Sequence, residues 1–406
     1  MTATGNVEEN CNVKDDKTQT SAILNHSRQF MSLQVIPVST RRHRNDFFAL
    51  RRTLYKDNPA VVFPLDSMAR LQLDTDKHPF YQHAEREIFV AYIDEKPVGR
   101  VAAIIDRMQQ AHNQNRIGCF GFLESIDDQA VVNALLSAAE SWLAERGCDQ
   151  IQGPMDPSMK GEFGVLVDGH DESPMIMTAY NFARYRGQLL KCGFEPAREF
   201  HCYNFYSSNP PEEQWDRLFK SRDKIFARFP QLSFRSVEAA TFEKTMRDIN
   251  ELGNQVRSEG WGFVPLTDAE LAFMIKNLRR VIRYDMIHVA YWEDRLVGYI
   301  VNIPDVNWAL KNTKGKWDIL RMLQLPKLLK KCPRTRVIAL GVDQDFRTKG
   351  IAMLLIARLV EKFKAFDEWE FSWVDSQNKK SIRAIARALP LLKTRTYQLF
   401  QKSIDG

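Results

Sequence analysis

One segment of this chain combines a strand pattern, a basic turn that contains glycine, and a helix pattern, from Val337 to Arg358. The apolar run up to Val342 predicts a strand, and the apolar period after Gly350 predicts a helix that begins at the turn. A helix N-terminus offers backbone N–H groups and partial positive charge, so this turn could hold a pyrophosphate. Gly350 allows the backbone to come close to an anion, and Arg347 and Lys349 add charge. A plain surface turn is the alternative interpretation.

The elements around this turn occur twice along the chain. The second half predicts strands at 232–237, 337–342 and 369–374, a hairpin at 286–303, and helices at 242–256, 268–278 and 350–366. The first half predicts strands at 33–38, 117–123 and 150–153, a hairpin at 88–105, and helices at 47–55 and 130–146. Both hairpins carry Val-Ala-Tyr before the turn and Val-Gly after it. We interpret this order as an internal duplication of an α/β unit.

The duplication sets the predicted domain organisation. We expect a disordered polar tail at 1–32, a first domain at 33–205 and a second at 206–406 with an insert at 305–336. The first domain has the acidic segment Glu124-Ser-Ile-Asp-Asp-Gln129 where the second has its basic turn, and the segment contains no glycine. Because acidic side chains repel a polyphosphate, the anion site is predicted in the second domain alone.

Composition argues against several other classes of protein, such as membrane-spanning and zinc-binding proteins. The 406 residues are 44% hydrophobic, which suits about two packed domains, and no stretch reaches the length of a membrane-spanning helix. The six cysteines form no zinc-binding spacing, so we expect reduced thiols and no metal. A net charge of +6 does not require nucleic acid as a partner. We expect a cytoplasmic protein.

The segment Leu340–Ala352 resembles the acyl-CoA-binding motif of the GNAT superfamily of N-acyltransferases, a strand followed by Q/R-x-x-G-x-G/A. Further segments resemble a bacterial double-GNAT group that includes bacterial ceramide synthase-type acyltransferases: Gly153–Ser158, Gly164–Gly169, Pro174–Met177 and Trp261–Leu266. The chain departs from that group at Tyr185-Arg186, where a Tyr-Tyr pair is common. The resemblance implies two tandem GNAT-like domains, each a mixed, mostly antiparallel sheet flanked by helices.

The resemblance also implies positions for an acyl-CoA or acetyl-CoA donor. Leu340 and Val342 would offer backbone groups to the pantetheine arm, and Asn378 would steady the cofactor. Tyr397 falls where many such enzymes keep a tyrosine near the leaving thiolate, and packing in the core is its alternative role. The phosphate loop would consist of Arg347, Thr348, Lys349, Gly350, Ile351 and Ala352.

GNAT chemistry needs a neutral amine, a polarised thioester carbonyl and a proton for the thiolate. Asp343 could act as a base, although a cap or turn role suits an aspartate at a strand end. Glu162 and His170 belong to a glycine-containing loop and are candidate bases on the acceptor side. Tyr180, Asn181 and Tyr185 could line the same wall or simply pack.

The insert at 305–336 mixes tryptophan and leucine with basic residues. From Lys311 to Arg336 there are nine basic residues and one acidic residue, Asp318. This pattern is typical of an interfacial helix on an anionic membrane, and an amphipathic helix packed on its own domain is the alternative. The first interpretation predicts that the protein attaches to the inner face of the membrane.

Three functions fit these observations. The leading hypothesis is an acyl-CoA-dependent N-acyltransferase that transfers a long-chain acyl group to a sphingoid or other lipid amine. A non-catalytic acyl-CoA or lipid-binding protein is the second, and an acetyltransferase acting on a small soluble amine is the third. Specificity depends on the shape of the binding site, which a single sequence does not display.

Overall fold

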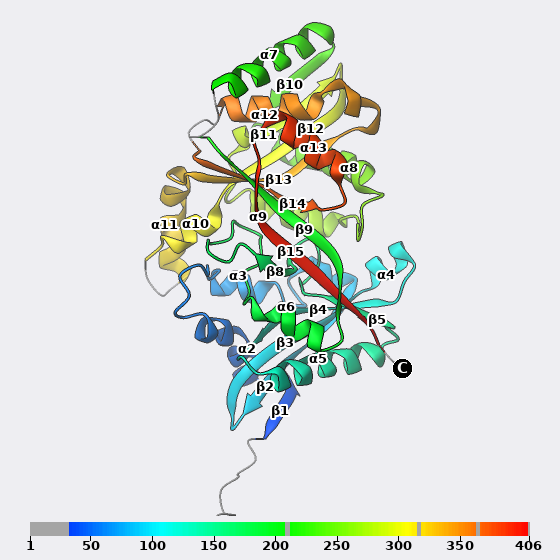
Figure 1. The fold of residues 1–406 in the computed structure, drawn as a ribbon, viewed down its shortest axis with the longest axis vertical. Helices are drawn as coiled ribbons and strands as arrows, with labels where there is room; N and C mark the ends of the chain where they lie inside the picture. Colours follow the sequence, from blue (N-terminus) through cyan, green and yellow to red (C-terminus); the bar gives the residue numbers. More distant parts are fainter. Residues whose placement is uncertain (1–31, 208–211, 315–317, 363–365, 405–406) are drawn as a thin grey trace, which may run out of the picture.

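A computed structural model describes residues 32–207, 212–314, 318–362 and 366–404. The predicted tail at 1–32 lies outside these residues except for Ser32, as do Cys11 and Trp317. Within the described part of the chain, thirteen strands form one large mixed sheet, and helices cover it. Figure 1 shows an elongated molecule with the first half of the chain at one end and the second half at the other. The predicted α/β class is confirmed.

The first half contains the predicted elements. Its strands are β1 (Leu33–Pro37), β2 (Ala84–Ile93), β3 (Lys96–Asp106), β4 (Ile117–Ser125) and β5 (Gln150–Gly153). Its main helices are α2 (Arg41–Leu54) and α5 (Gln129–Ala144), with the shorter α3 (Asp66–Leu71), α4 (Arg107–Asn113) and α6 (Arg184–Lys191). Helix α5 begins at Asp128, whose side chain accepts from Ala130 N at 2.8 Å. Its apolar face is buried against the sheet.

The second half repeats this order. Its strands are β10 (Leu232–Ser236), β11 (Ile287–Trp292), β12 (Arg295–Pro304), β13 (Arg334–Val342) and β14 (Glu368–Asp375). Its helices are α7 (Glu212–Arg228), α8 (Phe242–Arg257), α9 (Asp268–Leu278), α12 (Ile351–Lys362) and α13 (Lys379–Ala388). The insert forms α10 (Val306–Lys311) and α11 (Asp318–Lys330). Helix α7 is an addition to the predicted set.

The last strand of each half completes the sheet of the other half. Strand β9 (Glu195–Tyr206) ends the first half and pairs with β14, while β15 (Leu392–Ser403) ends the second half and pairs with β5. The strands also pair with each other, so the sheet runs without a break as β5-β15-β9-β14. In Figure 1, β9 and β15 cross the middle of the molecule together. The predicted boundary at 205–206 separates the two halves in the sequence. In space the halves are not separate, because each contributes its last strand to the sheet of the other.

Candidate active site

Strands β13 and β14 separate at the middle of the second half. They pair in parallel only over Arg334–Val337 and Glu368–Phe371. On its other side, β13 pairs with β12. Val301 of β12 lies opposite Ala339 and Asn302 lies opposite Val337, so Ile338 is an extra residue that forms a β-bulge. Residues 338–340 are half-buried, although 335–337 are buried. This opening between 338–342 and 372–375, called the second gap below, leaves one side of the β13 backbone available to an extended ligand.

The predicted phosphate loop follows β13. Residues Gln344–Lys349 form a 3-10 helix, and Gly350 has a φ of 79°, a conformation that glycine adopts without strain. Arg347 and Thr348 are exposed, Ile351 is buried and Ala352 is half-buried. The Lys349 ammonium lies among three rings instead, 5.2 Å from those of Phe229 and Trp292 and 5.8 Å from that of Phe346. Cation–π contact thus accounts for its charge without a phosphate.

Leu340 and Val342 keep their pairing with β12 on one side, opposite Ile300 and Gly298. No strand pairs with them on the β14 side within the described residues. The positions therefore suit the backbone role that the sequence predicts for them.

Three other predicted residues have structural partners. Asp343 is buried, accepts from Asp345 N at 3.0 Å and pairs with Arg295 at 2.6 Å, which is the cap role. Asn378 caps α13 by accepting from Ser381 N at 3.1 Å. Tyr397 is fully buried, and its hydroxyl donates to Ala179 O at 2.9 Å. Burial raises the pKa of Tyr397 well above its ordinary value. The chemical roles predicted for these residues therefore gain no geometric support.

The first half has the matching gap, but its own chain fills it. Strands β4 and β5 pair only over Ile117–Cys119 and Gln150–Gln152. The short strand β6 (Met155–Asp156) lies in the opening beyond, where Asp156 accepts from Phe122 N at 2.6 Å. A Cβ on Gly121 would lie only 1.9 Å from Met155 O. Residues 120–125 are all buried, so an acyl-CoA arm has no room here.

A charged cavity lies beside this filled gap. Its lining includes Arg51, Glu124, Asp156, Glu162 and the three predicted wall residues Tyr180, Asn181 and Tyr185. The Glu124 carboxylate pairs with Arg51 at 3.6 Å and accepts from the hydroxyls of Tyr55 and Tyr185 at 2.9 and 3.0 Å. The carboxylate of Glu162 forms no hydrogen bond or ion pair with any described side chain. It is therefore free to take a ligand or a proton.

Glu162 lies at the junction of the cavity and the second gap. Its neighbour Phe163 stacks on Trp373 of β14, with ring centroids 4.2 Å apart, and Trp373 stands where β14 leaves β13. Burial raises the pKa of Glu162, while the charges of Arg51 and Arg336 lower it by less. Burial likewise raises the pKa of Asp156 to about 7. Both carboxyl groups can thus change protonation nearer to neutral pH than an exposed acid.

His170 stands one side chain away from the cavity. Its ring lies 6.1 Å from that of Tyr180, and its carbonyl oxygen accepts from the Tyr180 hydroxyl at 3.0 Å. Burial lowers the pKa of His170. It is not among the residues that line the cavity, so Glu162 is the better placed of the two predicted bases.

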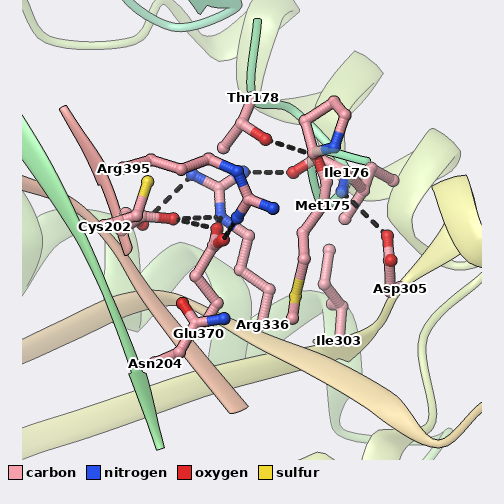
Figure 2. Close-up of polar contacts among 12 residues, drawn as sticks. Met175, Ile176, Thr178, Cys202, Asn204, Ile303, Asp305, Arg336, Glu370 and Arg395 are labelled. Atoms are coloured by element: carbon pink, nitrogen blue, oxygen red, sulfur yellow. Dashed lines mark hydrogen bonds and ion pairs between the residues drawn. The ribbon is translucent and has the colours of Figure 1, made fainter. Parts of the chain in front are cut away.

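A buried ionic network closes the base of the second gap (Figure 2). Glu370 of β14 pairs with Arg395 of β15 at 3.0 Å and with Arg336 of β13 at 3.6 Å. Both guanidinium groups also donate to the first-half loop that precedes α6, Arg395 to Ser173 O at 3.0 Å and Arg336 to Ile176 O. The network therefore joins three strands and this loop at the point where β13 and β14 separate.

The described residues contain no group of three or more His, Cys, Asp or Glu side chains arranged to hold a metal. Five cysteines in this part of the chain are free thiols. In the same residues, no helix is both long enough and apolar enough to span a bilayer.

Comparison with known proteins agrees with this architecture. The acetyltransferase (GNAT) family model matches residues 255–389. The chain is 28% identical over 383 residues to the bacterial ceramide synthase of Caulobacter vibrioides, covering 92% of this chain and 98% of that protein. It is also 28% identical over 378 residues to protein YghO of Escherichia coli, covering 90% and 95%. A solved tandem GNAT protein from the clavulanic acid biosynthesis pathway aligns over 92% of this chain and 99% of its own, with a TM-score of 0.53 and 9% identity.

The second half therefore matches the GNAT family model, and the chain as a whole has the fold of a tandem GNAT protein, in which two GNAT-like units follow one another. These similarities support N-acyl transfer in general, with an acyl-CoA or acetyl-CoA cosubstrate and an amine acceptor.

Sequence reasoning missed part of this site. Arg51, Asp156 and Trp373 come from three distant segments, and no motif marks them as neighbours. Glu124 stood out only as part of an acidic segment. The signal that could have found Asp156 is its place between two prolines in Gly153-Pro-Met-Asp-Pro157, a local pattern that suits an irregular turn more than a regular strand.

Proposed function

We propose that this protein is an acyl-CoA-dependent N-acyltransferase that holds its donor in the second gap and acylates a lipid amine. The observation that carries the donor assignment is the contrast between the gaps. The first is filled by Met155 and Asp156, whereas the second leaves residues 338–340 half-exposed beside a turn that ends in Gly350.

The acceptor amine enters from the first half, where Glu162 has no competing partner among the described side chains. Glu162 takes a proton from the ammonium group, and the neutral nitrogen then attacks the thioester carbonyl. The new C–N bond forms as the C–S bond breaks, and the thiolate leaves with the electron pair of that bond. Backbone N–H groups of 338–342 are the candidates to stabilise the carbonyl oxygen. The thiolate finally takes up the proton that the nitrogen releases, directly or through water.

A lipid acceptor is supported by the apolar surroundings of the second gap. Ile176, Ile338 and Ala339 all pack against one apolar core. Ile176 also packs, with Leu325 and Leu329 of α11, against a second one. A continuous apolar path thus runs from the gap to the insert. The relative named bacterial ceramide synthase, similar over nearly its whole length, supports a long-chain donor and a sphingoid-type amine.

The donor site is tested by Ala352→Glu with Ala352→Gln as its matched control. A carboxylate in the first turn of α12 is favourable for the helix but repels a pyrophosphate at the same N-terminus, so the protein should fold and lose CoA affinity. The glutamine variant has nearly the same size without the charge and should bind more tightly. Calorimetry with equal CoA affinity for the two folded variants would contradict the donor site.

The acceptor is tested by mass spectrometry of reactions with long-chain acyl-CoA or acetyl-CoA and either sphinganine or a soluble amine. An N-acyl sphingoid product with the long-chain donor supports the proposal. Acetylation of the soluble amine alone would favour the third function, and acyl-CoA that is bound but left intact, with no amide formed, would favour the binding protein.

A further inference from the structure

Helix α11 is held to the first half by its charged side chains. The Asp318 carboxylate accepts from the backbone N–H groups of Asp66 and Ser67, at 3.1 and 2.8 Å, at the start of α3. Arg321 is buried and donates to Phe63 O at 2.9 Å and to Pro64 O at 3.3 Å. These contacts from the first turn of the helix fix its orientation, and Figure 1 shows α11 at the side of the molecule beside α10.

The same orientation exposes the apolar side chains of α11. Leu323 is 77% and Ile319 72% exposed, and Leu320 and Met322 are each 46% exposed. Met68, on the neighbouring α3, is 55% exposed. Four of the nine exposed large apolar side chains in the described part of the chain therefore lie on this short helix. A concentrated apolar patch of this kind marks an interaction surface, because soluble proteins usually bury such groups.

Unpaired lysines continue this surface toward the end of α11. Lys327 and Lys330 follow Ile319 and Leu323 at the spacing that places residues on one side of a helix, and Lys331 comes directly after. All three are exposed, and none forms an ion pair with a described acidic residue. Lys314, before the helix, is likewise exposed without an ion pair in that part of the chain.

We propose that the α11 face, made of Met68, Ile319, Leu320, Met322, Leu323, Lys327, Lys330 and Lys331, docks this protein on an anionic membrane surface. The apolar side chains enter the boundary between headgroups and acyl chains, and the lysines contact lipid phosphates. Charge argues against a second copy of the chain as the occupant, because this face contains no acidic residue to pair with the lysines of another copy, and Asp318 of α11 is already bonded to α3. Trp308, on α10, is half-buried and is not needed for this surface.

The first test is sedimentation of the full chain with phosphatidylcholine vesicles that contain phosphatidylglycerol, against phosphatidylcholine alone. The protein should bind the anionic vesicles and dissociate as salt rises, since these charges are exposed to screening. The double variant Ile319→Glu, Leu323→Glu should lose this binding. The matched control Leu190→Glu, Leu392→Glu changes two exposed leucines elsewhere, 41% and 59% exposed, and should keep it.

The second test reverses the charge. Each basic residue near an anionic surface raises the binding constant about fivefold. The triple variant Lys327→Glu, Lys330→Glu, Lys331→Glu should therefore weaken vesicle binding by about a hundredfold or more. The control triple Arg217→Glu, Lys220→Glu, Lys224→Glu on α7 should have little effect. CoA affinity should be unchanged in the α11 variants, which separates failure of this surface from failure of the proposed function.

Three outcomes would overturn the proposal. One is a wild-type protein that ignores anionic vesicles, and another is a control that loses binding as fully as the α11 variants. The third is a concentration-dependent dimer, seen by analytical ultracentrifugation, that Leu323→Glu abolishes while vesicle binding persists.

Discussion

Arg395 on β15 and Glu370 on β14 form an ion pair at 3.0 Å in which both side chains are almost completely buried. The two strands are not neighbours in the sheet, since β9 lies between them. The pair therefore crosses over β9, and Arg395 also donates to Ser173 O in the loop before α6. The base of the second gap therefore depends on a contact between β14, in the sheet of the second half, and β15, the strand that completes the sheet of the first half.

Removing one partner of this pair should be costly. We expect Glu370→Gln to lower the free energy of unfolding by about 3–5 kcal/mol, because two buried guanidinium groups lose their common carboxylate. Urea unfolding of the variant measures this loss. The control is Glu368→Gln, which removes a carboxylate 3.0 Å from Arg334 at a more exposed position on the same strand. A loss in Glu370→Gln no larger than in the control would show that the network adds little.

Gly350 should resist substitution for two separable reasons. Its φ of 79° costs an alanine about 1–2 kcal/mol, and a Cβ there would lie 2.7 Å from Ile225 Cδ1 on α7. Gly350→Ala should therefore destabilise the protein by at least that amount. In an Ile225→Ala background the steric part should disappear and the backbone part should remain. Urea unfolding of the four proteins checks this cycle, and an equal cost in both backgrounds would rule out the contact with Ile225.

Glu162 predicts a pH dependence of the reaction. Because burial raises its pKa above the ordinary 4.5, the basic form appears only as pH rises through that higher value, and kcat should rise with it. Glu162→Gln should lower kcat by about 10²–10³-fold and remove this limb of the profile, with little change in the KM for the donor. Glu162→Asp should retain part of the rate. An unchanged pH profile in Glu162→Gln would assign the limb to the amine itself.

Asp156 predicts a pH dependence of stability with the opposite sense to that of a salt-bridged acid. Its pKa rises on folding from 3.8 to about 7, so the folded state retains a proton that the unfolded state loses between these values. Stability from this group is therefore full below pH 3.8 and falls as pH rises to about 7, by up to about 1.4 kcal/mol per pH unit.

Asp156→Asn should flatten that slope, because an amide does not titrate in this range. Its oxygen can still accept from Phe122 N, so the local structure should persist. Thermal unfolding between pH 4 and about 8 compares it with Asp94→Asn, which changes an exposed turn residue. The same slope in the wild type and Asp156→Asn would contradict the prediction.

Local sequence patterns predicted the elements that depend on local physics. The apolar periods of β12, β13 and α12 reflect burial on one side or both, and the turn at Gly350 has a residue type suited to its positive φ. Lys349 shows the limit of such reasoning. It was predicted as part of the phosphate loop from its charge in the turn and from the GNAT resemblance, neither of which indicates the rings of Phe229, Trp292 and Phe346 that surround it.

The arrangement of the last strands could not be predicted for a similar reason. The alternation in β9 and β15 indicates a strand but does not specify its neighbour, because pairing depends on the shape of the whole sheet. The free carboxylate of Glu162 also results from tertiary contacts, since Glu124 rather than Glu162 takes the hydroxyls of Tyr55 and Tyr185.

The exchange of β9 and β15 has a consequence for synthesis on the ribosome. Strand β5 has no partner on its outer side until Leu392–Ser403 emerges, long after the rest of the first half has been translated. During that interval the nascent chain carries an unpaired strand edge, which is a site for misassociation between neighbouring chains on a polysome. We therefore expect slow elongation or high expression to favour chaperone dependence and domain-swapped oligomers in this protein, and expect separately expressed halves to recover solubility only when they are produced together.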